Sequence, residues 1–143
     1  MKKFQKAIGL VLGVFLLTVF AVFSVSCNKE KSVTATVEKV NESTVAIFVL
    51  ECSGGATVLD AMKSLQKKGE LSFEISSGMV TEMEGKANGG SSYWMLYTDD
   101  NDFATDEYGT VEYGGQTLGS AVLGANALQV SVGKTYVWIY TTF

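Results

Sequence analysis

The apolar and polar residues between positions 54 and 69 follow the spacing of one amphipathic helix. Thr57 can serve as the N-cap, and Asp60 stands three residues later, where an acidic side chain completes a capping box. Gly69 follows two lysines and can take the left-handed conformation that ends a helix. The apolar face of this helix is expected to consist of Val58, Leu59, Met62 and Leu65.

Runs of β-branched and aromatic residues surround this helix and predict a sheet. The expected strands are residues 32–40, 44–52, 71–76, 79–83, 93–98, 128–132 and 136–140. We expect a flexible loop at residues 86–92, where Gly and Ser are frequent, and an irregular segment at residues 99–126. One main helix packed on a mixed or antiparallel sheet makes an α+β domain.

The first 26 residues have the composition of an export signal. Lysines near the start precede an apolar run from Ala7 to Val25, and the chain becomes polar directly after Cys27. The stretch FSVSC resembles a bacterial lipobox, in which the cysteine is diacylated and becomes the mature N-terminus, although Ser24 stands where leucine is usual. An uncleaved anchor or simple secretion is the alternative, because the apolar run nearly reaches the roughly 18–20 residues that span a bilayer.

These features divide the chain into a lipoprotein signal peptide at residues 1–26, a tether at residues 27–32 and a domain at residues 33–143. Lipid on Cys27 would hold the domain to the membrane on its extracytoplasmic side. After the signal is removed, 8 lysines face 15 acidic residues, so the net charge is −7, and the sequence has no arginine. This acidity argues against nucleic acid and anionic membrane surfaces as partners.

The sequence contains no arrangement typical of an enzyme. Histidine is absent, the carboxylates are mostly placed singly on predicted surface faces or in a loop, and no serine or threonine has a recognisable base partner. Cys52 is expected to be a small buried side chain or to form a disulfide with Cys27, since no histidine could activate its thiol. We therefore predict a protein that binds and does not catalyse, without a zinc site of histidine and cysteine.

An acidic segment that begins at Asp99 is a weak candidate for a metal site. Asp99, Asp100 and Asp102 could offer oxygen ligands to calcium. Their spacing fails the EF-hand pattern, because neither a ligand nor a turn glycine follows at the required positions. A solvated acidic loop is the main interpretation.

Aromatic residues are frequent for a domain of this size and indicate a binding surface. On the last strand, Tyr136, Trp138 and Tyr140 share one face, while Val137 and Ile139 share the other and suffice for a core. We expect the aromatic face to be half exposed and to bind a flat ligand or a sugar, with the predicted flexible loop as its rim. Packing of these rings in the core is the alternative. The predicted ligand-binding residues are Tyr93, Trp94, Tyr97, Trp138 and Tyr140.

Four motifs give the chain a family resemblance. They are Gly55-x-Thr57-Val58-Leu59-Asp60-Ala61, Gly78-Met79 through Gly85, Ser92-Tyr93-Trp94-x-x-Tyr97 and Tyr136-x-Trp138-x-Tyr140. In this order they resemble the transcobalamin C-terminal-like domain, which is common in exported bacterial proteins, and the resemblance covers roughly residues 45–143. It implies a β-grasp-like fold and a soluble ligand, with cobalamin as the first ligand to consider.

In vertebrate cobalamin carriers this domain is the smaller half of a two-domain clamp. The present chain lacks the large helical half and any histidine that could coordinate cobalt. The resemblance therefore implies a corrinoid site completed by shape or by a partner, with Tyr93, Trp94, Trp138 and Tyr140 stacking on the ligand. A cell-surface module that contacts another protein, with calcium as a stabilising ion, is the second interpretation.

Overall fold

The structure is a computed structural model that describes residues 30–143. The predicted signal peptide, residues 1–26, and the predicted lipidation site, Cys27, lie outside the described residues, as does half of the predicted tether. Among the described residues the first strand begins at Ser32, the last residue of the predicted tether.

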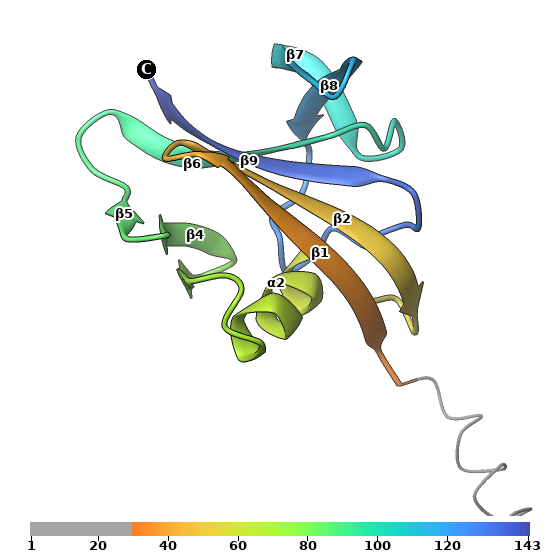
Figure 1. The fold of residues 1–143 in the computed structure, drawn as a ribbon. Helices are drawn as coiled ribbons and strands as arrows, with labels where there is room; N and C mark the ends of the chain where they lie inside the picture. The colour runs from red at the N-terminus through yellow and green to blue at the C-terminus, as the bar shows by residue number, and fades with distance from the viewer. Residues whose placement is uncertain (1–29) are drawn as a thin grey trace, which may run out of the picture. The chain divides into compact units, whose positions relative to one another are not determined.

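Six antiparallel strands form the main sheet in the order β1-β2-β9-β6-β8-β7 (Figure 1). They are β1 (Ser32–Asn41), β2 (Thr44–Ser53), β6 (Ser92–Thr98), β7 (Ala104–Tyr113), β8 (Gln116–Ala121) and β9 (Thr135–Thr142). The last strand of the chain, β9, therefore lies in the middle of the sheet, between β2 and β6. Its continuous apolar sequence suits a strand whose two faces are both covered.

The predicted helix is α2 (Val58–Lys67), and its start has the predicted capping box. The Asp60 amide donates to Thr57 Oγ1 at 3.3 Å, and the Thr57 amide donates to Asp60 Oδ2 at 2.8 Å. These reciprocal bonds satisfy amides that the start of a helix otherwise leaves free. Gly69, with a φ of 75°, takes the left-handed conformation expected beyond the C-terminus.

A second, three-stranded sheet lies with α2 on one face of the main sheet (Figure 1). Its strands are β3 (Phe73–Ser76), β4 (Met79–Met83) and β5 (Lys86–Ala87). The main core fills the space between this layer and the main sheet. The helix contributes Val58, Met62 and Leu65, which are fully buried, and β9 contributes Tyr136 and Trp138. The fold is therefore α+β and dominated by antiparallel sheet.

A smaller apolar cluster covers the opposite face of the main sheet. It forms because the β7–β8 hairpin folds back over that face, so that Tyr113 on β7 reaches strands at the far side of the sheet (Figure 1). The Tyr113 hydroxyl donates to Glu38 on β1 at 2.7 Å, and its ring centroid lies 6.2 Å from that of Phe48 on β2. The buried members of this cluster are Ala46, Tyr97, Leu118 and Val137.

Three predictions of local structure are wrong. The segment at residues 99–126 contains the β7–β8 hairpin, whose mostly exposed first strand and irregular register hide the alternation of a strand. Residues 128–132 form only an isolated bridge, and the amide of Val130 donates to the carbonyl of Ala56 just before the helix. The expected flexible loop at residues 86–92 contains β5, which side chains of the main sheet hold in place.

Candidate functional site

The predicted binding residues lie on opposite faces of the main sheet and do not form one site. Trp94 pairs with Tyr140 across β6 and β9, and both side chains pack on the main core together with Trp138. Tyr93 and Tyr97 alternate with Trp94 along β6, so their side chains lie on the other face. The five rings therefore belong to two different surfaces.

The prediction that the aromatic face of β9 is half exposed is wrong. Tyr136 is fully buried and Trp138 is only 4% exposed, because α2 and the small sheet cover this face. Val137 packs in the smaller cluster, so the aliphatic side chains of β9 do not form the main core. Tyr97 is also buried, whereas Tyr93 remains exposed.

Trp94 and Tyr140 use their polar atoms to hold β5. Trp94 Nε1 donates to the carbonyl of Lys86 at 2.7 Å, and the Tyr140 hydroxyl donates to the carbonyl of Ala87 at 2.7 Å. The Lys86 ammonium lies 4.5 Å from the centroid of the Tyr140 ring, which is a cation–π contact. Asn88 accepts the Trp94 amide at 2.9 Å. These contacts give both rings a structural role and hold residues 86–88, the first part of the segment that the sequence predicted to be flexible.

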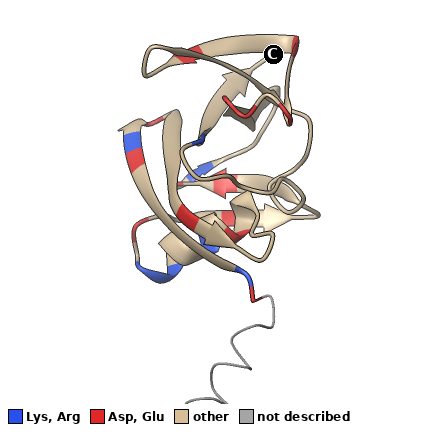
Figure 2. Cartoon of the chain, turned by 90° about the vertical axis from the view of Figure 1, so that its right-hand side faces the viewer, with Lys and Arg blue, Asp and Glu red and all other residues tan. Residues whose placement is uncertain are grey.

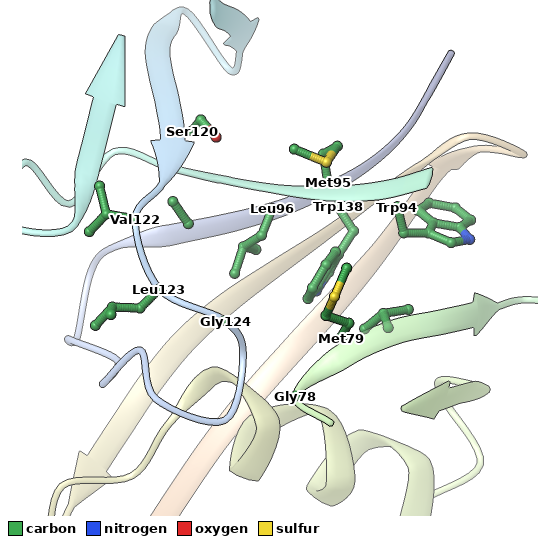
Figure 3. A pocket seen from close by; sticks show the side chains of 12 residues that line it. Gly78, Met79, Trp94, Met95, Leu96, Ser120, Val122, Leu123, Gly124 and Trp138 are labelled. Carbon is green, nitrogen blue, oxygen red and sulfur yellow. The ribbon is translucent and has the colours of Figure 1, made fainter. Parts of the chain in front are cut away.

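A groove of about 270 Å³ lies between β6 and the β3–β4 turn and includes both tryptophans of the chain (Figure 3). Its rim carries Met79, Val122 and Leu123, with exposed fractions of 64%, 53% and 41%. Figure 3 shows Met79 extending toward Trp138, whereas Met95 points away on the other side of β6. We call it the Trp138 groove, and its lining residues are Gly78, Met79, Val80, Trp94, Met95, Leu96, Ser120, Ala121, Val122, Leu123, Gly124 and Trp138.

Two glycines let the β3–β4 turn approach the loop after β8, and both line the Trp138 groove. Gly78 has a φ of 80°, and a Cβ there would lie 2.6 Å from Asn126 Oδ1. A Cβ on Gly124 would lie 3.1 Å from the carbonyl oxygen of Gly78. The amide of Leu59, in the first turn of α2, donates to the carbonyl of Ala125 at 2.9 Å. The start of the helix thus positions the loop that carries part of the groove's rim.

Trp138 differs from Trp94 in the state of its polar atom. Trp138 Nε1 is buried and has no hydrogen-bond partner, and no other buried side-chain nitrogen or oxygen in residues 30–143 lacks one. A buried donor without an acceptor costs about 1–3 kcal/mol. Trp138, a residue that lines the groove, therefore carries an unused donor.

The sequence analysis did not identify the rim of the groove. Val122 and Leu123 are two adjacent large apolar residues in a segment rich in glycine and alanine, and this pair is the signal that could have located them. For Met79, the alternation of the surrounding residues indicates only a strand. Its position beside Trp138 depends on how the small sheet packs on the main sheet.

The three aspartates considered for calcium do not converge on one point. Asp99 Oδ1 accepts the amide of Thr135 at 2.8 Å, and Asp100 Oδ1 accepts the amide of Asp102 at 3.2 Å. Asp100 is 5% exposed, so the interpretation as a solvated loop is wrong for this residue. Within residues 30–143, no three side chains of the metal-binding types are grouped to hold an ion, and acidic residues are spread over the strands (Figure 2). The carboxylates of Asp99 and Asp100 accept backbone amides, one from β9 and one within the turn, and these contacts do not support a calcium site.

Cys52 lies on β2 with a partly buried side chain. Its thiol donates to the carbonyl of Val130 at 3.6 Å, which is consistent with the expected role of a small packed side chain. Cys27, the partner considered for a disulfide, lies outside the described residues.

From residue 30 to residue 143, no helix combines the length and the apolar character needed to cross a bilayer. Comparison of the sequence with protein-family models and with curated proteins gives no match.

Proposed function

We propose that the chain is an exported lipoprotein, anchored by lipid on Cys27, whose domain binds a soluble ligand in the Trp138 groove and catalyses no reaction. The domain is β-grasp-like in this proposal, because one helix packs across one face of an antiparallel sheet. The observation that carries the proposal is the groove itself, where three exposed apolar side chains surround two buried tryptophans. Large apolar side chains exposed together on a small domain mark a binding surface.

The size of the groove limits which part of a ligand can enter it. Its volume of about 270 Å³ is near the lower end of the roughly 300–1,000 Å³ that small-molecule sites occupy. The groove accommodates a ring-sized group and not a complete corrinoid. Cobalamin, which the sequence resemblance makes the first ligand to test, would insert a peripheral group and leave its remainder exposed or in contact with a partner.

Calorimetric titration of the full chain tests this proposal. The probes are cobalamin, a corrinoid that lacks the nucleotide loop, and simple glycans. Leu123→Ser removes an apolar contact from the rim and should weaken binding about fivefold or more. Leu50→Ser is the matched control, because Leu50 is a leucine of similar exposure on β2 that does not line the groove, and it should leave binding unchanged. Absence of saturable binding by every probe would contradict the small-molecule function.

A module that contacts another protein is the second candidate, and the exposed rim of the groove favours it. In that case Met79, Val122 and Leu123 would insert into the partner. Cells that carry the chain should then adhere or aggregate, and Leu123→Ser should abolish this while Leu50→Ser should not. The small molecules should give no heat of binding.

The anchor is tested independently of the ligand. A fatty-acid probe fed to cells should label the wild-type chain and the Cys52→Ala variant, because only Cys27 lies in the lipobox-like sequence. The Cys27→Ala variant should lose the label. Labelling of that variant at the wild-type level would contradict lipidation at Cys27.

A further inference from the structure

We propose that Trp138 gives the groove its chemical selectivity, so that it binds an uncharged, mainly apolar group that carries a hydrogen-bond acceptor such as a carbonyl oxygen. This inference rests on the proposed function, because it specifies the class of ligand for the same groove. It follows from three features of the lining, namely a free donor, the absence of charge and a flexible side chain beside Trp138.

The free donor is evident from the contrast between the two tryptophans. Trp94 Nε1 donates to the carbonyl of Lys86 at 2.7 Å, whereas Trp138 Nε1 is buried without an acceptor among the described residues. An indole nitrogen donates a hydrogen bond and accepts none. Trp138 therefore favours a ligand that delivers an acceptor, because the new bond removes the cost of the unsatisfied donor.

The lining excludes charged groups. No Asp, Glu, Lys or Arg lines the Trp138 groove, and Ser120 supplies the one hydroxyl among the lining residues. A carboxylate would satisfy the indole donor, but it would lose its hydration without gaining a counter-charge. A neutral acceptor gains the same hydrogen bond at a much smaller cost of desolvation. Ketones, esters and amides next to an apolar group meet this requirement.

Access to Trp138 depends on Met79. This side chain is 64% exposed at the start of β4, and Figure 3 shows it extending toward the Trp138 ring. Methionine is unbranched and flexible, so it can change rotamer at little cost. Trp138 Nε1 is buried without a ligand, so an acceptor can reach it only if a neighbouring side chain moves, and in this proposal that side chain is Met79.

Nuclear magnetic resonance provides the test, because the chain has only two tryptophans. A proton–nitrogen correlation spectrum of the full chain then has two indole N–H signals, and Trp94 is an internal control because its N–H is already bonded. Three probes are compared: acetophenone, ethylbenzene, which has the same ring without the carbonyl, and benzoate, which is charged. Acetophenone should move the Trp138 signal downfield further than ethylbenzene does and leave the Trp94 signal nearly unchanged. Benzoate should bind more weakly than acetophenone.

A variant separates the hydrogen bond from the apolar contact. Trp138→Phe retains a ring and removes the donor. It should therefore lower the affinity for acetophenone roughly three- to tenfold and change the affinity for ethylbenzene little. The Met79 methyl signal reports occupation of the groove in both proteins. Should Trp138→Phe fail to fold, the comparison of acetophenone with ethylbenzene on the wild-type chain decides the matter.

The outcomes distinguish this inference from the proposed function. If the Met79 methyl responds equally to acetophenone and ethylbenzene, and the Trp138 indole signal shows no added response to acetophenone, the groove binds ligands and the selectivity is overturned. If neither residue responds to any of the probes, the groove is not a site and both proposals are overturned.

Discussion

Trp94 and Tyr140 form a cross-strand pair whose polar atoms both bind the same short strand. Their ring centroids lie 5.3 Å apart, and β5 receives a hydrogen bond from each. Rings that the sequence predicted to meet a ligand are therefore used to hold the small sheet against the main sheet. Trp138 lines the same groove as Trp94 but has no such bond, and this difference directs the functional proposal to Trp138.

Removal of the Tyr140 hydroxyl should destabilise the domain. We expect Tyr140→Phe to lower the free energy of unfolding by about 1 kcal/mol, because the Ala87 carbonyl loses its donor. Denaturant unfolding measures the change. Tyr93→Phe is the matched control, because the hydroxyl of Tyr93 makes a longer bond, 3.3 Å against 2.7 Å, to the Gly90 carbonyl, and its loss should have little effect. Equal losses in the two variants would contradict the role assigned to Tyr140.

The close approach at Gly78 should make it less tolerant of a side chain than another glycine of similar conformation. Gly78 and Gly85 have φ of 80° and 77°, so alanine is strained at both, by about 1–2 kcal/mol. Only at Gly78 would the added Cβ meet another group, the Asn126 side chain at 2.6 Å. We therefore expect Gly78→Ala to cost about 1 kcal/mol more than Gly85→Ala in thermal unfolding.

The cause of that difference can be checked in a double variant. Asn126→Ala in the Gly78→Ala background should restore the stability that Gly78→Ala loses beyond Gly85→Ala. The strain of the positive φ remains in the double variant. A double variant as unstable as the sum of the two single variants would show that the clash is not the cause.

The capping box at the start of α2 should contribute measurably to stability. Thr57→Ala removes the oxygen that accepts the Asp60 amide and should cost about 1 kcal/mol of unfolding free energy. Ser64→Ala, in the middle of the same helix, should be neutral or slightly stabilising, because alanine has the higher helix propensity. Unchanged stability of Thr57→Ala would contradict the assigned cap.

Tyr136 and Tyr113 should ionise at a higher pH than a tyrosine in the unfolded chain. Burial, followed by the charges of nearby aspartates, raises the pKa of Tyr136 to about 12. Burial, then the hydrogen bond to Glu38 and its charge, raises the pKa of Tyr113 to about 12. The ordinary value of 10.0 applies to the unfolded chain, so these groups stabilise the fold fully below pH 10. That contribution is lost as the pH rises through about 12.

Absorbance of tyrosinate during an alkaline titration measures this directly. Tyr136→Phe and Tyr113→Phe should each remove one group that ionises at high pH. In each variant the free energy of unfolding should decrease less steeply above pH 10. Simultaneous ionisation of all tyrosines in the folded chain would contradict the burial of Tyr136 and the bond from Tyr113 to Glu38.

The helix was predictable because its determinants lie within a few residues of one another. Thr57, Asp60 and Gly69 specify its two ends by backbone bonds and conformations that need no distant partner. Strands β1 and β2 were predictable for the same reason, since each is a local run rich in β-branched residues. The β7–β8 hairpin was not, because β7 is mostly exposed and is held by its pairing with β8 and by the contact of Tyr113 with β1.

By itself, then, the sequence determined the α+β class, the helix at residues 58–67 with its cap and the richness in aromatic rings. Only the tertiary structure decided which rings reach the surface, because alternation separates the two faces of β9 without showing which face α2 and the small sheet cover. The same packing of distant segments brought Met79, Val122 and Leu123 to one groove beside Trp138. The site depends on that packing because its lining comes from four separate stretches of the chain, which no local pattern places together.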